Sequence, residues 1–120
     1  MFELSVQREF CAAHAIMIGG RREPVHGHNW LVTLTVAGAK LDSNGLLCDF
    51  HVLERRLDEV ITRFNNNDLN ATEPFDRINP TAERVAELIG QQVALHLPFG
   101  AQLVSVSIRE APGCTATYKP

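Results

Sequence analysis

The stretch "VHGHNWLVTLTVA", residues 25–37, joins two histidines to a run of alternating apolar residues. From Trp30 onward a large apolar side chain stands at every second position, which is the period of a strand with one buried face. We therefore predict a strand over Asn29–Ala37. Side chains two residues apart on a strand project to the same side, so His26 and His28 point together. The stretch predicts part of the core and a pair of imidazoles beside it.

Segments on both sides of this strand extend the pattern. Alternation predicts a strand from Phe2 to Phe10 that can continue through His14 to Met17, and "GGRREP" then breaks regular structure. Apolar residues at intervals of three and four predict two helices in the middle of the chain, and alternation returns near its end. The predicted helices are residues 49–64, capped by Asp49, and residues 79–97, capped by Asn79; the further strands are residues 46–48, 103–109 and 115–118.

The order of these elements indicates the fold class. Strands lie at both ends with the helices between them, which favours an antiparallel sheet over the parallel sheet of alternating strands and helices. We expect an α+β fold with a four-stranded antiparallel sheet and two helices on one face. The 120 residues show no repeat or linker and are expected to form one domain, residues 1–120.

Composition narrows the class of protein. Hydrophobic residues make up 45% and charged residues 21%, as in a soluble globular chain. A net charge of −3 without a basic stripe argues against a nucleic-acid partner. Apolar stretches are too short to span a membrane, and we expect no signal peptide. Cys11, Cys48 and Cys114 are an odd, scattered set, so we expect free thiols and a reducing, cytoplasmic compartment.

The histidine pair suggests a metal site. Neutral imidazoles bind zinc at about 2.0–2.1 Å, and a catalytic zinc takes three protein ligands with a fourth position open. The spacing HxH alone leaves metal binding and chance equally open. A third ligand has to come from His14, His51 or His96. We interpret the two helix-end residues, His51 and His96, as surface residues, whereas His14 lies on the strand expected to pair with this one and can meet the pair across the ladder.

Five motifs resemble the 6-pyruvoyl-tetrahydropterin synthase family, which includes bacterial 6-carboxytetrahydropterin synthase. In this order and spacing they are "FCAAHAI", "VHGHNW", "DFHVLERRL", "NPTAERVAELI" and "IREAPGCTATY", and together they span nearly the whole chain. The resemblance implies four antiparallel strands backed by two helices in a tunnelling fold (T-fold). It also implies subunits that close a barrel as trimers or hexamers, with active sites between them. The implied activity converts 7,8-dihydroneopterin triphosphate with a zinc ion held by His14, His26 and His28.

The resemblance also implies residues that bind the substrate. Glu110 matches a glutamate that anchors the pterin, and one carboxylate can accept hydrogen bonds from a ring N–H and an adjacent amino group together. From its place alone, Glu110 is a solvated residue at a strand end. Thr81 and Glu83, in "NPTAE", match a stretch that lines the pterin pocket in relatives, and both also suit the N-terminus of a helix.

The chain departs from the family pattern at the expected cysteine. Relatives of the 6-carboxytetrahydropterin type carry CxxxHGH, but the residue four before His26 is Arg22. We interpret Cys11 as a small buried hydrophobic residue that faces away from the metal. Glu23 stands nearby in the pattern ExxHGH, which resembles a subgroup that cleaves the pterin side chain to give 6-hydroxymethyl-dihydropterin. A carboxylate there can act as a general base, or it is simply one charge in the loop "RREP".

A second departure concerns the Asp-His pair that relays protons in the family. Aligned on Leu69 and Asn70, the matching residues are Asn65 and Asn66. An amide does not titrate, so neither residue can move a proton. Asp68 is the nearest titratable residue, and it is either a replacement acid or base or a turn former. The metal and pterin ligands therefore match the family while the acid–base residues do not.

These observations leave three hypotheses of different kinds. The first is a zinc-dependent lyase acting on dihydroneopterin triphosphate that yields 6-hydroxymethyl-dihydropterin, with 6-carboxy- or 6-pyruvoyl-tetrahydropterin as the second choice of product. The second is a non-catalytic protein that binds a pterin or purine, which the missing cysteine and Asp-His pair favour. The third, a structural subunit stabilised by metal, predicts no pterin binding at all. Turnover of the triphosphate by metal-replete protein separates the first from the others.

Overall fold

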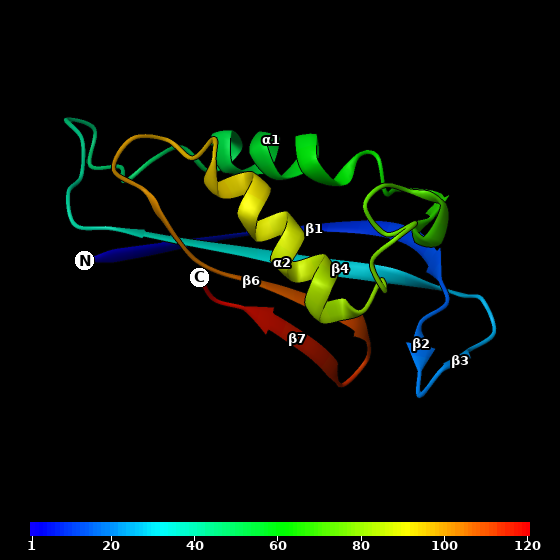
Figure 1. The fold of residues 1–120 in the computed structure, drawn as a ribbon. Coiled ribbons are helices and arrows are strands. Elements are labelled where there is room, and N and C mark those ends of the chain that lie inside the picture. The colour runs from blue at the N-terminus through cyan, green and yellow to red at the C-terminus, as the bar shows by residue number, and fades with distance from the viewer.

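The computed structural model describes all 120 residues, and its framework is a ladder of two long strands (Figure 1). β1 (Phe2–His14) and β4 (His26–Gly38) each contain 13 residues and run antiparallel. Every second residue of β4 from Trp30 to Val36 is buried, so the predicted core face is confirmed. At one end of the ladder His14 pairs with His26, which places both histidines at the edge of the core.

Three further strands complete the sheet. β6 (Gln102–Ala111) pairs with β4, and β7 (Cys114–Tyr118) pairs with β6, both antiparallel. β5 (Asn67–Asp68) adds a two-residue parallel pairing beside β1, so the strand order is β5-β1-β4-β6-β7. The predicted sheet of four antiparallel strands is confirmed. β5 is an addition that the sequence pattern could not show, because two residues carry no period.

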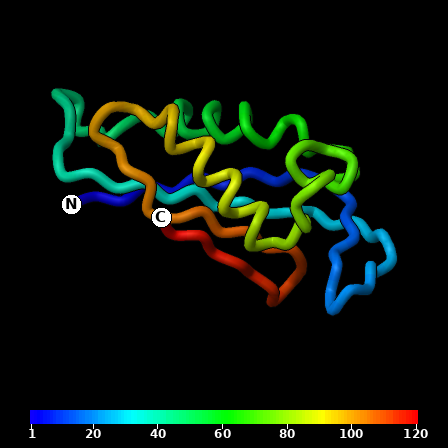
Figure 2. The backbone as a smooth tube through the Cα atoms, viewed as in Figure 1, coloured from blue at the N-terminus to red at the C-terminus, as the bar shows by residue number.

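Two helices cover one face of the sheet, as predicted, and the tube view shows both lying over the long ladder (Figure 2). α1 (Phe50–Ile61) is capped by Asp49, as expected. α2 (Ala82–Ala94) begins later than predicted, because the residue that caps it is Thr81. The predicted cap at Asn79 is therefore wrong.

The core lies between the helices and the sheet. A cluster of 21 buried residues fills it, and Phe10 stacks on Trp30 with ring centroids 5.7 Å apart. Trp30 also donates its indole N–H to the carbonyl of Ala12 at 3.0 Å, which satisfies its one polar group. The Trp30 ring lies 4.8 Å from the ring of His14. The packed core therefore closes one side of the region that contains the histidines.

The stretch "GGRREP" is more regular than predicted. β2 (Met17–Ile18) and β3 (Arg21–Arg22) form a short hairpin there. Its two linking residues, Gly19 and Gly20, have φ values of 57° and 81°. Glycine takes this left-handed backbone without steric cost, which is why the same residues that signal a break can close a hairpin.

Two smaller predictions are also wrong. Residues 46–48 form no strand, because a carboxylate oxygen of Asp42 accepts the backbone N–H of Leu46 and holds the chain in a turn. Cys11 is exposed rather than buried. Its neighbours Phe10 and Ala12 fill the core on the covered face of β1, so Cys11 falls on the open face.

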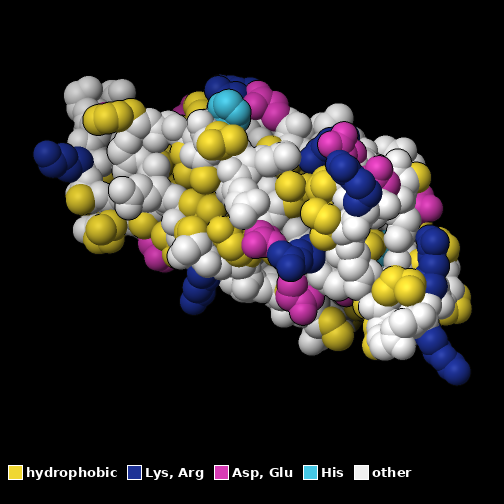
Figure 3. Space-filling view, in the orientation of Figure 1, with side chains coloured by type: hydrophobic (Ala, Val, Ile, Leu, Met, Phe, Trp, Pro, Cys, Tyr) yellow, Lys and Arg dark blue, Asp and Glu magenta, His cyan; other side chains and the backbone are white.

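The surface carries charges of both signs. On the face shown in Figure 3, basic and acidic side chains lie beside one another over the helices. Several are paired, such as Arg56 with Glu59 at 2.7 Å and Arg84 with Glu87 at 2.7 Å. Neither helix has the length and hydrophobicity needed to cross a membrane.

Candidate metal centre

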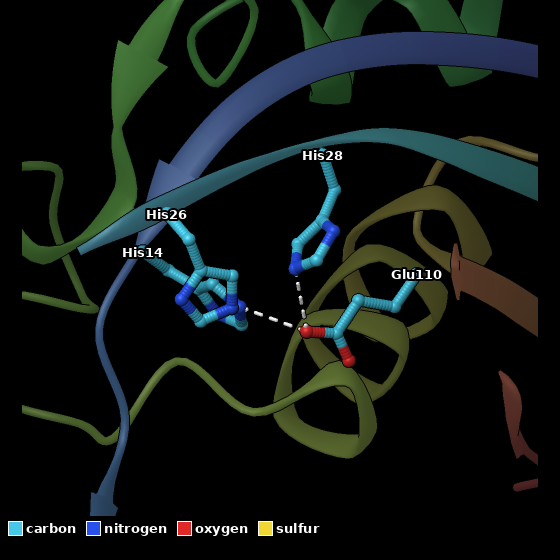
Figure 4. A group of neighbouring side chains, drawn as sticks. All are labelled: His14, His26, His28 and Glu110. Carbon is cyan, nitrogen blue, oxygen red and sulfur yellow. Dashed lines mark ion pairs between the residues drawn. The ribbon is translucent and has the colours of Figure 1, made fainter. Parts of the chain in front are cut away.

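The paired ends of β1 and β4 bring three histidines together (Figure 4). His14 lies opposite His26 in the ladder, and His28 lies two residues further along β4. The three ring centroids are between 4.7 and 5.3 Å apart. His14 is 1% exposed, whereas the other two are partly exposed. The group is therefore closed by the core on one side and open on the other.

Backbone carbonyl groups orient two of the rings. Nδ1 of His14 lies 2.8 Å from the carbonyl oxygen of Pro80, and Nδ1 of His26 lies 2.9 Å from that of Pro24. A carbonyl oxygen can only accept, so Nδ1–H is the donor in both rings. Each Nε2 then keeps its lone pair for another partner. Second contacts of this kind fix the tautomer of histidines that bind metals.

A carboxylate completes the group. Glu110, near the end of β6, has Oε1 2.8 Å from Nε2 of His14 and 3.1 Å from Nε2 of His28. Although these distances are short, neither Nε2 atom has a hydrogen-bond partner in good geometry, and both are buried. One nitrogen from each histidine and one Glu110 oxygen all lie within 4.8 Å of one another. Two buried ring nitrogens therefore face a common centre without a satisfied bond.

Electrostatics favours neutral ligands at this centre. Burial lowers the pKa of His28 below its ordinary value, and the neighbouring His14 and His26 lower it further, while Glu110 opposes the shift. A neutral imidazole is the form that binds a metal ion. Three convergent nitrogen donors with an adjacent carboxylate suit zinc, which accepts both ligand types. The residues present fit a zinc ion.

A cavity adjoins the histidine group. It has a volume of about 310 Å³, and both Glu83 and Glu110 line it, together with the turn between β6 and β7. A larger cavity of about 650 Å³ lies at the opposite end of the ladder, beside Gly38 and Leu47, and none of the four clustered residues lines it. The smaller cavity is the candidate substrate site, because it shares Glu110 with the histidine group.

Comparisons with known proteins identify the family of this chain. Residues 3–120 match the family model described as 6-pyruvoyl tetrahydropterin synthase. The chain belongs to this family. It is 36% identical over 128 aligned residues to the 6-carboxy-5,6,7,8-tetrahydropterin synthase of Bacillus subtilis (strain 168), an alignment that covers 99% of this chain and 86% of that protein. The family assignment makes the chain a pterin-processing enzyme of the tetrahydropterin synthase type.

Solved structures of tetrahydropterin synthases share the fold. The Caenorhabditis elegans 6-pyruvoyl tetrahydropterin synthase superposes with a TM-score of 0.83 at 22% identity, covering 100% of this chain and 97% of that one. A Plasmodium vivax 6-pyruvoyltetrahydropterin synthase, in a variant with a catalytic glutamate replaced by alanine, superposes with a TM-score of 0.81 at 21% identity, covering 99% and 97%. At these identities the likeness establishes the T-fold that the synthases have in common.

Glu23 lies beside the histidine group, as expected from its position three residues before His26. Its Oε1 is 3.7 Å from Nε2 of His26 and accepts the backbone N–H of Ile16 at 3.1 Å. The bond to Ile16 anchors the carboxylate across the base of the β2–β3 hairpin. Glu23 thus stands at the open edge of the group, outside the four clustered ligand atoms.

The other acid–base candidate is used locally. Asp68 caps the short 3-10 helix η1 (Leu69–Ala71) by accepting the backbone N–H of Asn70 at 2.9 Å, and its side chain is exposed. Asn65, at the position of the family's aspartate, accepts the backbone N–H of Cys11 at 3.0 Å. The Asn65 side chain therefore fastens the loop to β1, and the Asp68 side chain caps η1 within the loop.

Two asparagines that support the site were not predicted from the sequence. The side chain of Asn70 accepts the N–H of Ala15 at 2.8 Å and donates to its carbonyl oxygen at 2.9 Å. The side chain of Asn79 makes the same two bonds with the backbone of Met17: it accepts the N–H at 2.8 Å and donates to the carbonyl oxygen at 3.0 Å. An amide has one acceptor and one donor side, so it can replace a missing strand partner. The only signal for this in the sequence was that asparagine is common where chains leave regular structure.

The remaining predicted residues lie at the edges of the region. Thr81 precedes α2 and its hydroxyl accepts the N–H of Arg84 at 3.1 Å, so that oxygen is already in use as a helix cap. His51 is on α1 with Nδ1 2.8 Å from Glu54, and its side chain is 78% exposed. His96 is also exposed. The structure therefore groups His14 with the HxH pair and leaves the two helix-end histidines outside.

Proposed function

We propose that this chain is a zinc-dependent lyase that acts on 7,8-dihydroneopterin triphosphate and yields 6-hydroxymethyl-dihydropterin. The observation that carries the proposal is the convergence of three histidine nitrogens beside a cavity lined by carboxylates. In this proposal His14, His26 and His28 hold the zinc ion. When bound, zinc acts as a Lewis acid that favours ionisation of a substrate hydroxyl and stabilises the negative charge that develops on oxygen.

The ring and the reacting side chain of the substrate meet different residues. Glu110 and Glu83 face the cavity and accept hydrogen bonds from the amino group and ring N–H of the pterin. Thr81 directly precedes Ala82, which lines this cavity, and it completes the pocket at the start of α2. These contacts orient the ring so that its hydroxylated side chain reaches the histidine group.

Glu23 moves the proton in this mechanism. It takes the proton from the side-chain hydroxyl whose carbon becomes a carbonyl, while the bond from that carbon to its ring-side neighbour breaks. The same carboxyl group then returns the proton to the ring-side carbon, so that protons and electron pairs balance. A positioned general base of this kind contributes roughly 10²–10⁴-fold to a rate. Asp68 is the second candidate for this role, and its exposed position on β5 makes it the weaker one.

Two observations support a glutamate as the base. The carboxylate of Glu23 lies 3.7 Å from a histidine ring nitrogen, at the open side of the group. The catalytic residue replaced in the Plasmodium vivax synthase is also a glutamate. A 6-carboxy- or 6-pyruvoyl-tetrahydropterin product is the second choice, supported by the names of the relatives.

We further expect a cytoplasmic homo-oligomer, a trimer or hexamer. The three cysteines are free, which suits a reducing compartment. β7 is an open edge of the sheet, and β5 covers only two residues of β1, so both sides of the sheet have strands that can pair with another subunit. A monomer in sedimentation at micromolar concentration contradicts this expectation.

The deciding experiment incubates zinc-loaded protein with 7,8-dihydroneopterin triphosphate and identifies the products by mass. The expected product is 6-hydroxymethyl-dihydropterin. A 6-carboxy or 6-pyruvoyl product keeps the lyase and changes the assignment of the subgroup. Binding of the pterin without any product, under every metal condition, overturns the lyase.

A non-catalytic pterin- or purine-binding protein is the second candidate. The observation that favours it is the loop at residues 65–68, where amides replace the family's Asp-His pair and the side chains of Asn65 and Asn67 bond to backbone groups. In that case affinity for the pterin remains and turnover is absent, in the parent chain as well as in the Glu23→Gln variant.

A further inference from the structure

Glu110 has two possible partners in this structure. Its Oε1 lies within 3.1 Å of Nε2 of both His14 and His28, while the same side chain lines the neighbouring cavity. Figure 4 shows the carboxylate pointing from β6 into the histidine group. The carboxylate of Glu110 therefore faces the imidazoles and the cavity together.

We infer that Glu110 is the fourth ligand of the metal ion in the substrate-free protein, and that its carboxylate leaves the ion for the pterin ring when substrate binds. The inference rests on the proposed function, because it takes the three histidines as the metal ligands and a pterin as the occupant of the cavity. It goes further by giving Glu110 two roles that exclude each other.

Geometry supports the resting role. The ligand atoms of His14, His26, His28 and Glu110 lie within 4.8 Å of one another, so small side-chain movements would bring all four to bonding distance of one ion. The carboxylate of Glu23 also lies near the group, but it stands 3.7 Å from Nε2 of His26 and is not part of that set. Only one of the two nearby carboxylates therefore has the position of a ligand.

Charge supports it as well. Three neutral imidazoles leave a divalent ion with its full double charge next to the buried edge of Trp30 and the core. One carboxylate halves that net charge, which lowers the cost of holding the ion in a partly desolvated site. Four protein ligands also close the coordination sphere, and a closed sphere is the arrangement of an ion that does no chemistry. The resting site is then inactive until a substrate draws the carboxylate away.

Exchange of one carboxylate between two partners has a thermodynamic consequence. If the ring and the ion both need Glu110, each lowers the affinity of the protein for the other by the same factor. The natural substrate would hide this effect, because its hydroxyls also interact with the ion. A pterin without side-chain hydroxyls, 6-methylpterin, isolates the competition for the carboxylate.

The test measures zinc affinity by competition with a chelator, with and without 6-methylpterin. In the parent protein 6-methylpterin should weaken zinc binding. Glu110→Gln should bind zinc at least about tenfold more weakly than the parent, since loss even of a residue that supports a ligand costs 10–100-fold. In that variant 6-methylpterin should no longer change zinc affinity. Glu87→Gln is the matched control: this carboxylate pairs with Arg84 on α2, outside the cavity and the histidine group, and its loss should leave the parent's zinc affinity unchanged.

Each outcome bears on a separate part of the inference. Unchanged zinc affinity in Glu110→Gln overturns the fourth ligand, provided that His28→Ala loses zinc in the same assay. Weaker zinc binding in Glu110→Gln without competition by 6-methylpterin in the parent overturns the exchange. Neither measurement depends on turnover, so a protein that binds zinc in this way but forms no product refutes the lyase and leaves the inference standing.

Discussion

The histidine group and the loop at residues 65–71 lie on either side of the end of β1. Their polar side chains differ in whether their hydrogen-bonding atoms are already paired. In the histidine group, backbone carbonyls accept from Nδ1 of His14 and His26, while the buried Nε2 atoms of His14 and His28 have no hydrogen-bond partner. In the loop, the side chains of Asn65, Asp68 and Asn70 accept hydrogen bonds from backbone N–H groups. The first region is arranged to bind something else, and the second to hold the chain in place.

Glu23 and Asp68 lie between these extremes, and they differ in whether the carboxylate reaches the histidine group or only nearby backbone groups. Glu23 makes one backbone bond, to Ile16, and its carboxylate still reaches the neighbourhood of His26. Asp68 makes a cap bond and lies on the exposed side of the loop. By this criterion Glu23 belongs with the site and Asp68 with the scaffold. The following experiments test that division.

The largest expected effect is loss of the metal ion. His14→Ala, His26→Ala and His28→Ala should each lose bound zinc, because three neutral nitrogen ligands are the minimum set for such a site. Elemental analysis of purified protein measures the occupancy. His51→Ala is the control and should keep the ion, since that ring lies on α1 and contacts Glu54. Full occupancy in His28→Ala contradicts the assignment.

The next effect is on the rate of the proposed reaction. Glu23→Gln should keep pterin affinity and lower kcat by about 10²–10⁴-fold, because an amide cannot accept the proton. Asp68→Asn should leave kcat near that of the parent. Steady-state kinetics with dihydroneopterin triphosphate distinguishes the two. If Asp68→Asn is the slower variant, the division drawn above is wrong and the loop contains the base.

A smaller effect concerns stability. Asn70→Ala removes both partners of the Ala15 backbone in a partly buried place, and it should lower the free energy of unfolding by about 1–3 kcal/mol. Urea denaturation measures the change. Asn44→Ala, in the exposed turn before α1, is the matched control and should cost about 0.5 kcal/mol or less. Equal effects at the two positions would show that the two bonds between Asn70 and Ala15 add nothing measurable to the free energy of unfolding.

The smallest effect is a pH dependence of the metal-free protein. Because burial lowers the pKa of His28, the unfolded chain takes up a proton there at a higher pH than the folded chain. This contribution to stability is complete above the ordinary histidine pKa of about 6.5 and is lost as the pH falls toward the lower folded pKa. His28→Asn should therefore lose less stability than the parent between about pH 7.5 and about pH 5.5. Urea midpoints at the two pH values check the sign.

The sequence alone was enough for the layout of this protein. Apolar residues alternate along β1 and β4 and recur every three or four residues along α1 and α2, because the faces that pack in the core must be removed from water. This pattern is visible in the sequence itself. The same alternation placed His26 and His28 on one side. Pairing of the first two strands then favoured His14 as the third histidine over His51 and His96, because β-strand neighbours are set by the order of the chain.

Tertiary structure decided how each polar group is used. Whether Glu110 contacts the histidines, and whether Asn79 caps α2 or binds the backbone of Met17, depends on atoms brought together from distant segments. A polar side chain has several satisfactory local partners, and the choice among them rests on small free-energy differences set by the surrounding fold. An apolar side chain has only one demand, removal from water. The pattern of apolar residues therefore predicts the scaffold, whereas the roles of the polar residues become visible only in the folded chain.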